Sequence, residues 1–582
     1  MSNTKFLKLA EVFTYLEKTS SNLAMIDILA DFFPQISSQE AKITAYLLRG
    51  NLGPSYESLD FGLALKMTVK AIAYSEKIDI KKIENLLQET GDLGLVIEEF
   101  KKNKKGKGLS IEEVFKKMIE IAKIGGEGSQ EKKIIYLADL LSEVSGIEAK
   151  YIIRMILGTL RLGVGEMTFL QGLARAFGKG KEQKEILEYA FNILSDLGEV
   201  AFVVSKWGIK KIGEVEPKVG VPIRMMLANR VENLKEVSKH ISGNVSVEGK
   251  YDGERIQAHI KKNGEISLFS RQHENITHQY PDIIKGLKES FKGKEAIIEG
   301  EVVAFDKNEN KNLSFQILMS RRRKHKIEEY VQKIPVRYFL FDLLYLNNEN
   351  YLNKSLKERK FALEKFFKKT KNITFAEYVI TDNFLKTENY FNDSIKKGNE
   401  GVMVKDFSGI YQAGTRGWLW IKFKKEYEKD LADTFDLVVV GALYGSGRRA
   451  KTYGSLLVAS YDPETNEYYS FTKVGTGLTD ENLAKLPKIL DKYKLENKHK
   501  LVKTYMNVDV WFEPKIVIEI SGAEITVSPV HTVAENKIKT TGKQGGLALR
   551  FPKFLRLREK TPEDTTTVKE IYELYKGIKK RN

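Results

Sequence analysis

One short stretch of the chain holds an unusual density of residues that could act on phosphate. Glu248, Lys250, Asp252, Gly253 and Arg255 fall within eight residues, in the order EGKYDGER. A lysine amine attacks phosphorus only in its neutral form, which desolvation and neighbouring cations favour. A glycine lets the backbone approach a phosphate closely, and an arginine can bind that phosphate through its fork of donors. The stretch suggests nucleophilic catalysis at an α-phosphate, although a motif this short also arises in ordinary polar turns.

Two carboxylates and an aromatic ring follow where a nucleotide could use them. Glu299 and Glu301 are two residues apart, so they share one face of a strand, where they could coordinate a hard cation. Phe341 could stack on a purine base, although a phenylalanine in an apolar strand usually belongs to the core. Glu400 opens a strand-like run that ends at Lys405. Each of these features also has an ordinary structural explanation.

The remaining clusters are basic. Arg271 follows Ser270 at the end of a strand-like run, and Arg416 opens the segment RGWLWIKFK. In that segment Lys422 and Lys424 share one strand face, while the apolar residues beside them take the other. Lysines on an edge strand often serve only to prevent aggregation. Because no single structural explanation covers all these clusters, their common order favours nucleotidyl transfer.

The elements that must position these clusters change along the chain. Through about residue 215, apolar residues recur every three or four positions, which predicts helices. The lysine-rich segment 101–108 interrupts this pattern and is expected to be an exposed loop. From Val245 the period becomes two, with a two-residue turn at 263–264, which predicts strands.

The later part of the chain divides again. Strand-like runs lie at 295–305, 336–346, 401–405 and 418–423, with helical stretches such as 356–367 between them. Short alternating runs at 435–443, 455–461, 468–474 and 515–520 follow, separated by glycine-rich turns. The expected fold class is therefore multidomain, with an all-α domain, an α+β domain and a small β-barrel of the OB-fold type.

Composition limits the class of protein. The 582 residues predict several globular domains, and the formal net charge of +17 favours a polyanionic partner such as nucleic acid. The absence of cysteine excludes disulfides, thiolate zinc sites and thiol nucleophiles. The patterns GxxxxGK[ST] and HExxH are also absent, which disfavours a P-loop ATPase and a zincin. With no signal peptide and no apolar stretch long enough to cross a bilayer, we expect a cytoplasmic protein without membrane contact.

The ordered set of motifs resembles that of the ATP-dependent DNA ligases of the archaeal and eukaryotic replicative type, within the covalent nucleotidyltransferase superfamily. The resemblance spans essentially the whole chain. Segments 151–166, 222–230 and 549–560 (YIIRMILGTLRLGVGE, PIRMMLANR and LRFPKFLRLREK) are similar to parts of the family's successive domains. The resemblance implies a helical DNA-binding domain at 1–215, an adenylation (nucleotidyltransferase) domain at 216–426 and an OB-fold domain at 427–582.

The resemblance also implies a role for each candidate residue. Lys250 is similar to the lysine that forms a phosphoramidate with AMP, Glu248 to the acid that contacts adenine, and Phe341 to the ring that stacks on it. The phosphate-binding and nick-binding residues implied are Arg255, Arg271, Arg416, Lys422 and Lys424. The metal-associated acids implied are Glu301, near the ribose, and Glu400. The motif that orients pyrophosphate as the leaving group would contain Arg550, Arg556, Arg558 and Lys560, without indicating which of them does so.

The reaction implied by the family has three transfers. Lysine takes AMP from ATP, AMP passes to the 5′-phosphate of a nick in duplex DNA, and the 3′-hydroxyl displaces AMP to seal the strand, in replication, repair and recombination. The implied cofactors are ATP and Mg²⁺, with Mn²⁺ as an alternative. The implied partners are nicked duplex DNA and a sliding clamp, and we expect a monomer associated with the nucleoid.

Three alternatives stay open from the sequence. An RNA ligase, or a capping enzyme whose lysine takes GMP, would use the same central motifs, although the helical first third argues against capping enzymes. An NAD-dependent ligase is disfavoured because the bacterial enzymes carry a cysteine zinc site. A DNA-binding scaffold that has lost catalysis would not need Lys250, Glu301, Glu400, Lys422 and Lys424 intact.

Overall fold

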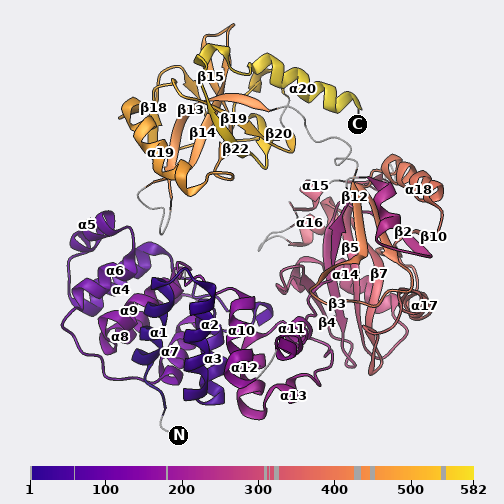
Figure 1. Ribbon diagram of the computed structural model, residues 1–582, viewed down its shortest axis with the longest axis horizontal. Coiled ribbons are helices and arrows are strands. Elements are labelled where there is room, and N and C mark those ends of the chain that lie inside the picture. Colours follow the sequence, from indigo (N-terminus) through magenta and orange to yellow (C-terminus); the bar gives the residue numbers. More distant parts are fainter. Residues whose placement is uncertain are drawn as a thin grey trace. The chain divides into compact units, whose positions relative to one another are not determined.

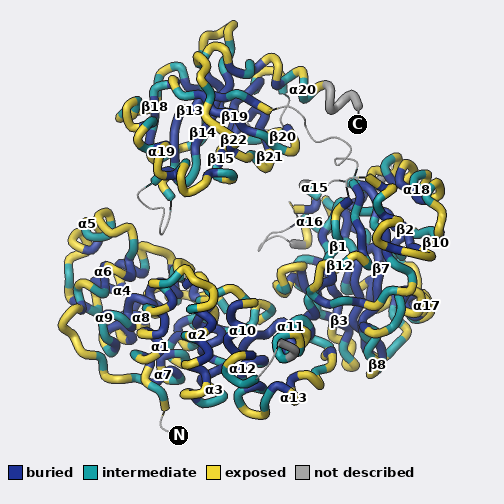
Figure 2. The backbone as a smooth tube through the Cα atoms, in the orientation of Figure 1, coloured by how far each residue is buried: buried dark blue, intermediate teal, exposed yellow. Residues whose placement is uncertain are grey.

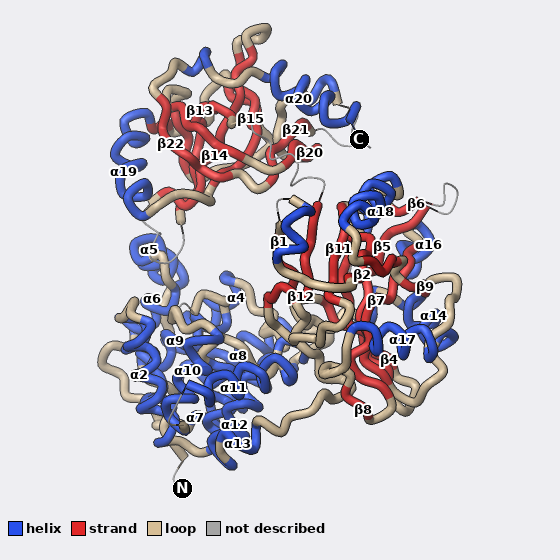
Figure 3. Tube along the Cα trace, turned by 45° about the vertical axis from the view of Figure 1, so that its right-hand side comes forward, coloured by secondary structure: helices blue, strands red, loops and turns tan. Residues whose placement is uncertain are grey.

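The computed structural model describes most of the chain in two compact units. The described residues are 3–581, apart from 58, 161, 179–180, 232, 307–310, 314, 320, 322–326, 425–433, 446–451 and 539–544. The units are Met1–Glu428 and Lys429–Asn582. The first unit contains a helical part followed by a sheet part (Figures 1 and 3).

The helical part confirms the three- and four-residue periodicity. Its helices are α1 (Phe6–Lys18), α2 (Asn22–Phe32), α3 (Ser38–Leu47), α4 (Leu65–Glu76), α5 (Ile80–Thr90), α6 (Leu93–Phe100), α7 (Ile111–Lys123), α8 (Ser129–Glu143), α9 (Gly146–Ile156), α10 (Glu166–Phe177), α11 (Lys181–Leu194), α12 (Leu197–Trp207) and α13 (Ile209–Ile212). Ser37, Ser110 and Ser145 begin three of them with capping boxes, which satisfy the first free backbone amides. The inward faces share one apolar core, and burial follows those faces in Figure 2.

The expectation of an exposed loop at 101–108 is wrong at its first residue. Lys101 is buried, and its Nζ lies 3.1 Å from Glu76 Oε1 and 2.6 Å from the carbonyl oxygen of Leu141. Lys104 Nζ adds a second contact, 2.7 Å from Glu76 Oε2. A run of lysines predicts a solvated loop only when no buried carboxylate faces it, and Glu76 is 25 residues away in sequence.

The sheet part of the first unit contains two sheets. The five-stranded sheet has the order β1-β12-β11-β2-β10, from β1 (Leu227–Arg230), β12 (Arg416–Lys424), β11 (Gly401–Asp406), β2 (Val245–Lys250) and β10 (Tyr378–Thr381). The seven-stranded sheet contains β3 (Glu254–Ile260), β4 (Ile266–Ser270), β5 (Ala296–Asp306), β6 (Lys311–Asn312), β7 (Val336–Leu346), β8 (Glu349–Asn350) and β9 (Ile373–Phe375). The turn predicted at 263–264 joins the antiparallel pair β3 and β4, and Gly264 has the positive φ of 81° that such a turn needs.

Helices cover these sheets and an apolar core joins them. The helices are α14 (Pro281–Ser290), α15 (Phe315–Met319), α16 (Ile327–Lys333), α17 (Leu356–Phe366) and α18 (Phe384–Lys396). One core cluster contains Phe339 and Phe341 from β7 together with Trp420 from β12, so it lies where the two sheets meet. The opposite face of the five-stranded sheet packs its apolar residues against Phe391 of α18.

The second unit is a curled β domain. Its strands are β13 (Phe435–Tyr444), β14 (Tyr453–Asp462), β15 (Glu467–Val474), β16 (Lys494–Leu495), β17 (Val502–Lys503), β18 (Val510–Phe512), β19 (Val517–Ser521), β20 (Glu524–Ser528), β21 (Gly546–Arg550) and β22 (Lys553–Arg558), with helices α19 (Asp480–Leu490) and α20 (Val568–Arg581). β13 pairs with β14, β18 and β19, which bends the sheet around one apolar core.

The expected succession of fold classes is confirmed, from helical to α+β to β. No helix among the described residues is long and apolar enough to cross a membrane. The expected boundary at 215 falls between α13 and β1, whereas the expected boundary at 426–427 lies outside the described residues.

Candidate active site

Three neighbouring strands of the five-stranded sheet form the floor of a cavity. The β2–β11–β12 registers align Lys250, Gly401 and Lys424 in one row, Glu248, Met403 and Lys422 in the next, and Ser246, Lys405 and Trp420 in the third. Because alternate side chains of a strand point to the same face, these nine residues share one face of the sheet. The floor therefore runs from a lysine-rich end at Lys250 to an end where Lys405 lies beside Trp420.

The cavity has a volume of about 180 Å³ and brings together residues from both sheets. Eight of the predicted site residues line it, namely Glu248, Lys250, Arg255, Arg271, Glu301, Phe341, Arg416 and Lys422. The other two join it through ion pairs: Glu400 Oε2 lies 2.6 Å from Lys250 Nζ and 2.9 Å from Lys424 Nζ. The ten predicted residues, up to 176 positions apart in the sequence, thus gather at one place.

The end of the cavity beside Lys250 carries an excess of positive charge. Among the described residues, no carboxylate lies within ion-pair distance of Arg271, Arg416 or Lys422. Burial lowers the pKa of the Lys422 ammonium below its ordinary value, and the charges of Lys250 and Arg416 lower it further. Cations crowded together without counter-charges form a binding site for a polyanion such as a triphosphate. We call this the phosphate end.

Three acids stand among these cations, and their pKa values are shifted in different directions. Burial raises the pKa of the Glu301 carboxyl to about 7, against the attraction of Lys250 and Arg255. Burial also opposes the ionisation of Glu400, but Lys250 and Lys424 outweigh it and hold the pKa of that carboxyl below its ordinary value. Burial and then the charge of Glu400 raise the pKa of Asp252. A nearby divalent cation would favour the ionised form of all three carboxyls.

The donor set of these acids fits a magnesium ion that also binds phosphate. No group of three or more His, Cys, Asp or Glu residues suited to a metal ion occurs among the described residues. Mg²⁺, however, usually takes only one or two protein carboxylates, with the substrate phosphates and water completing its octahedron. Glu301 and Glu400 could supply those carboxylates, whereas an all-protein metal cage is unsupported in the described part of the chain.

The opposite end of the cavity is fully paired. Glu248 is buried, and its Oε2 lies 2.7 Å from Lys405 Nζ while its Oε1 lies 2.9 Å from Lys360 Nζ. Lys405 Nζ also lies 4.4 Å from the ring centroid of Phe341 and 4.3 Å from that of Trp420. We call this the base end, because an aromatic wall and a hydrogen-bonding carboxylate are what a nucleobase requires.

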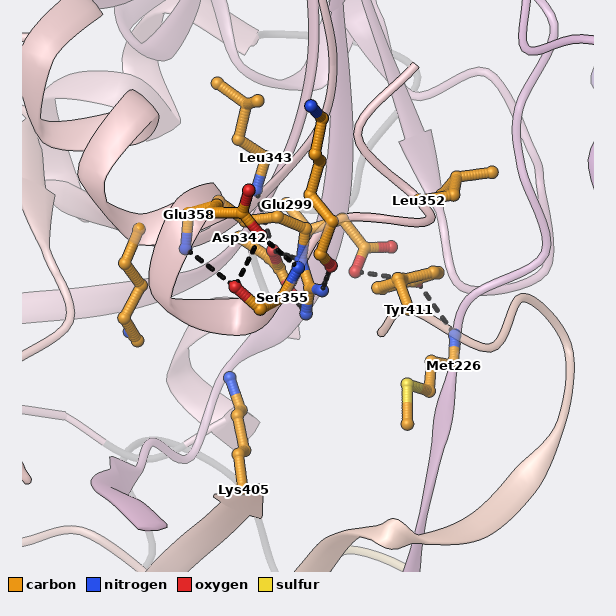
Figure 4. Close-up of polar contacts among 12 residues, drawn as sticks. Met226, Glu299, Asp342, Leu343, Leu352, Ser355, Glu358, Lys405 and Tyr411 are labelled. Atoms are coloured by element: carbon orange, nitrogen blue, oxygen red, sulfur yellow. Dashed lines mark hydrogen bonds and ion pairs between the residues drawn. The ribbon is translucent and has the colours of Figure 1, made fainter. Parts of the chain in front are cut away.

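A buried network fixes Arg255. Its Nη2 donates to Glu299 Oε2 over 2.6 Å, and its Nη1 donates to the carbonyl oxygen of Met226 over 2.7 Å. The hydroxyl of Tyr411 lies between them: it accepts from the Met226 amide over 2.8 Å and donates to Glu299 over 2.9 Å (Figure 4). The Nε of Arg255 is buried without a hydrogen-bond partner. Most of the guanidinium is therefore used to hold the fold, which leaves Nε as the donor for a ligand.

Three residues that shape this site do not stand out in the sequence. Lys405 ends a strand-like run already noted, and the period of two places it on the same face as Met403, which could have marked it. Lys360 and Tyr411 contact partners more than 40 residues away, which no local pattern indicates. Glu299 belongs to the predicted carboxylate pair, but its carboxylate pairs with Arg255.

The four basic residues predicted to orient pyrophosphate lie in the second unit, in or after β22 and at the end of β21. Arg556 Nε lies 2.5 Å from Glu519 Oε2, and Lys560 Nζ lies 2.6 Å from Asp436 Oδ2. Arg558 Nε lies 3.3 Å from Asp436 Oδ1, and Arg550 Nη1 lies 3.4 Å from Glu524 Oε2. Within this unit all four are paired with acids, so the pairing does not single one of them out.

Known proteins resemble this chain along its whole length. Sequence profiles described as DNA ligase N terminus, ATP dependent DNA ligase domain and ATP dependent DNA ligase C terminal region match residues 5–174, 225–424 and 449–561. A DNA ligase of Sulfophobococcus zilligii is 42% identical and aligns over 97% of this chain and 96% of its own. DNA ligase 2 of Thermofilum pendens is also 42% identical, over 98% and 97%. A solved structure named Pmar-Lig_PreS3 shares the fold, with a TM-score of 0.54 at 19% identity over 95% of this chain and 99% of that chain.

Proposed function

The chain belongs to the ATP-dependent DNA ligase family, and we propose that Lys250 is the residue that carries AMP. Enzymes of this family are nucleotidyltransferases that seal nicks in duplex DNA through adenylated intermediates, in replication, repair and recombination. ATP is accordingly the adenylate donor. What the family name leaves open is which residues of this chain perform each step.

The observation that carries the proposal is the charge arrangement around Lys250. Its amine borders a cavity whose phosphate end has three cations, Arg271, Arg416 and Lys422, without carboxylate partners among the described residues. The amine itself contacts Glu400 Oε2 at 2.6 Å, within the distance over which a carboxylate can hold or accept a proton. A nucleophile beside unpaired cations is the arrangement that attack on a triphosphate needs.

The first transfer uses the amine of Lys250 in its neutral form. Its nitrogen attacks the α-phosphorus of ATP and passes a proton to Glu400 Oε2, which lies 2.6 Å away. A nitrogen–phosphorus bond forms, and the bond from that phosphorus to the bridging oxygen breaks as pyrophosphate leaves. Lys422 and Arg416 neutralise charge on the non-bridging oxygens as the transition state develops. Phe341 stacks on the adenine, and Glu248 contacts its edge.

The second and third transfers use the same cations. An oxygen of the 5′-phosphate attacks the phosphorus of the lysine-bound AMP, and the lysine nitrogen leaves and regains its proton. The 3′-hydroxyl then attacks the 5′-phosphate, and AMP is the leaving group. We assign Arg271 to the nick phosphate and Arg255 to AMP through its Nε. Each transfer occurs in line at phosphorus, so positioning and charge neutralisation provide most of the catalysis.

Divalent-metal binding belongs to the same proposal. Glu301 and Glu400 would hold Mg²⁺ or Mn²⁺ together with the phosphates, and the ion would neutralise phosphate charge when bound. The pKa of Glu301, raised to about 7 by burial, supports this role, because a bound cation would return that carboxyl to its ionised form.

The rest of the chain would hold the nicked duplex. We propose domains at 1–215 for DNA binding, at 216–426 for adenylation and at 427–582 for the OB fold, acting as a monomer associated with the nucleoid. Contacts to phosphates would dominate, so binding should weaken steeply with salt and show little sequence preference. A sliding clamp is a further partner to test by pull-down, and sedimentation would test the monomer.

The test is transfer of label from α-³²P ATP to the protein, followed by denaturation. The wild-type chain should retain label, and Lys250→Ala should retain none, whereas Lys386→Ala, which removes an exposed lysine of α18, should label normally. GTP and NAD serve as alternative donors. If Lys250→Ala still became labelled, the assignment of the nucleophile would be wrong, and equal labelling by GTP would show that the cavity does not select adenine.

A further inference from the structure

The carboxylate of Glu248 is held between two buried lysines from different elements. Lys405 comes from β11 and contacts Oε2 at 2.7 Å, whereas Lys360 comes from α17 and contacts Oε1 at 2.9 Å. The side chains of Glu248, Lys360 and Lys405 are each at most 4% exposed. The hydroxyl of Ser246 donates a third hydrogen bond to Oε1 over 3.1 Å. We call these three charged residues the Glu248 triad.

Burying the charges of this triad costs desolvation free energy, which apolar residues in the same place would not cost. Replacing a buried ion pair by apolar residues is often neutral or stabilising, so such a cluster is weak evidence for a role in stability. Burial opposes the ionisation of Glu248, but Lys360 and Lys405 outweigh it and hold the pKa of its carboxyl below the ordinary value. The lysines therefore keep Glu248 as an anion in a place where a single carboxyl would be protonated.

The ionised state determines what Glu248 can recognise. A carboxylate offers only hydrogen-bond acceptors, whereas a carboxylic acid also offers a donor. Adenine presents a 6-amino donor on its edge, and guanine presents a carbonyl acceptor at the same position. An ionised Glu248 thus attracts the first base and repels the second, and a protonated Glu248 would accept both.

The register places Glu248 at the distance of a nucleobase from Lys250. The two residues share one face of β2 and are two positions apart, about 6.6 Å along the strand. Lys405 is one row further on, beneath the ring of Phe341, which borders the same cavity. A nucleotide with its α-phosphate at Lys250 therefore extends its base over Glu248 and against Phe341.

We propose that Lys360 and Lys405 are positioning residues that set the preference for a 6-amino purine, by holding Glu248 ionised and in one orientation at the base end. Neither lysine contacts the reacting phosphate in this proposal. It rests on the proposed role of Lys250, since the nucleotide is oriented by its attachment there. The determinant of base choice thus includes a helix, α17, that lies outside every motif of the sequence.

The experiment compares adenylation by ATP with that by purine riboside 5′-triphosphate, which lacks the 6-amino group, and by GTP. Single-turnover labelling or pyrophosphate release gives kcat/KM for each nucleotide. The wild-type chain should favour ATP over the purine analogue about 10- to 100-fold, the effect of one hydrogen bond to a charged group. In Lys360→Met and Lys405→Met the preference should fall to within about threefold of unity, mainly through a higher KM for ATP.

Matched variants separate positioning from damage to the fold. Lys357→Met removes an exposed lysine from the same helix and should leave the preference intact, and Lys360→Arg should restore it. Lys360→Met and Lys405→Met each remove a buried charge, so whichever variant folds carries the test, and Glu248→Gln tests the need for an ionised carboxylate if neither does. Glu248→Gln, whose amide offers both a donor and an acceptor, should accept GTP better than the wild-type chain does.

The outcomes distinguish the two proposals. A parallel loss with both nucleotides in Lys360→Met, at an unchanged ATP preference, would mean that the triad serves only the fold and would overturn the inference. Failure of the wild-type chain to become labelled by any nucleotide would instead overturn the assignment of Lys250. Normal labelling with ATP in the wild-type chain together with a lost preference in Lys360→Met supports both.

Discussion

The two ends of the active-site cavity solve the same problem of buried charge in opposite ways. At the base end, Glu248 compensates Lys360 and Lys405 before any ligand arrives. At the phosphate end, Arg271, Arg416 and Lys422 lack carboxylate partners among the described residues. The base end is preorganised, because its charges are compensated without a ligand. The phosphate end has uncompensated positive charge, which a bound polyanion would neutralise.

Because the two ends differ in this way, they contribute differently to binding energy. Charges that repel one another destabilise the unliganded chain, and the relief of that repulsion favours phosphate binding. Paired charges add nothing of this kind, but they fix the position of one recognition group. Affinity should therefore depend mainly on the phosphate end, and selectivity between bases on the base end.

The largest expected effect is on stability at the base end. Lys405→Met should lower the free energy of unfolding by about 3 kcal/mol, because it leaves part of the buried charge of Glu248 uncompensated. Lys422→Met removes a lysine from the phosphate end of the same sheet and should leave stability unchanged or slightly higher, because it relieves repulsion. Denaturant unfolding followed by circular dichroism measures both. Equal losses of stability in the two variants would show that charges at the two ends of the cavity contribute equally to the fold.

The next effect is on the rate of adenylation, and it should be large at the phosphate end, where the effect on stability is small. Lys422→Met should slow the formation of lysine-bound AMP about 100-fold, the usual cost of one preorganised charge donor at a transition state. Rapid-quench measurements with labelled ATP at saturating concentration report this step directly. The matched change Lys422→Arg keeps the charge and should recover much of the rate. A loss below threefold in Lys422→Met would show that the phosphate end tolerates removal of a cation.

Glu301 provides a pH test of the phosphate end. Its folded pKa of about 7 lies above the ordinary value of 4.5, so between those pH values the unfolded chain releases a proton that the folded chain keeps. Burial of Glu301 therefore costs nothing below pH 4.5, and the cost grows to its full size above pH 7. Glu301→Gln should be more stable than the wild-type chain by about 3 kcal/mol at pH 8 and equal to it near pH 4.5. Melting curves measured from pH 4.5 to pH 8 test this prediction. An equal difference in stability between the two proteins at the lowest and the highest pH would contradict the raised pKa of Glu301.

The smallest effect is stabilisation by an anion without a base. Inorganic tripolyphosphate, at several times its dissociation constant, should stabilise the chain by about 1 kcal/mol, and the effect should shrink with added salt. Differential scanning fluorimetry would detect it as a higher melting temperature. The shift should disappear in Lys422→Met and persist in Lys360→Met. The reverse pattern would place the anion at the wrong end of the cavity.

The sequence predicted well what depends on local order. The turn at 263–264, the strand at 336–346 and the shared face of Lys422 and Lys424 all follow from periodicity and turn chemistry. The ten site residues come together because their motifs lie on adjacent strands of two sheets. The resemblance to a known family, rather than spacing alone, assigned their individual roles.

What the sequence could not predict depends on distant pairing. Lys360 lies on the same helix face as Leu356 and Leu363, but nothing near it in the sequence indicates that its partner is Glu248. Lys101 is hidden for the same reason, since its partner Glu76 lies on another helix. Local patterns predict which face of an element a residue occupies. Only the tertiary fold shows which charged side chain lies opposite that face.

The segment that joins the helical part to the first sheet has an irregular backbone, yet several of its amides are hydrogen-bonded to other elements. The amide of Gly220 donates to His259 Nδ1, that of Ile223 to Gln257 Oε1, that of Arg224 to the carbonyl oxygen of Asn192, and that of Met226 to Tyr411. In hydrogen–deuterium exchange these four amides should therefore exchange as slowly as the paired amides of a regular strand, although none of them belongs to a helix or strand. A connection with such slow exchange is rigid. It includes the Met226 carbonyl oxygen, which accepts a hydrogen bond from Arg255 and so holds that side chain in place.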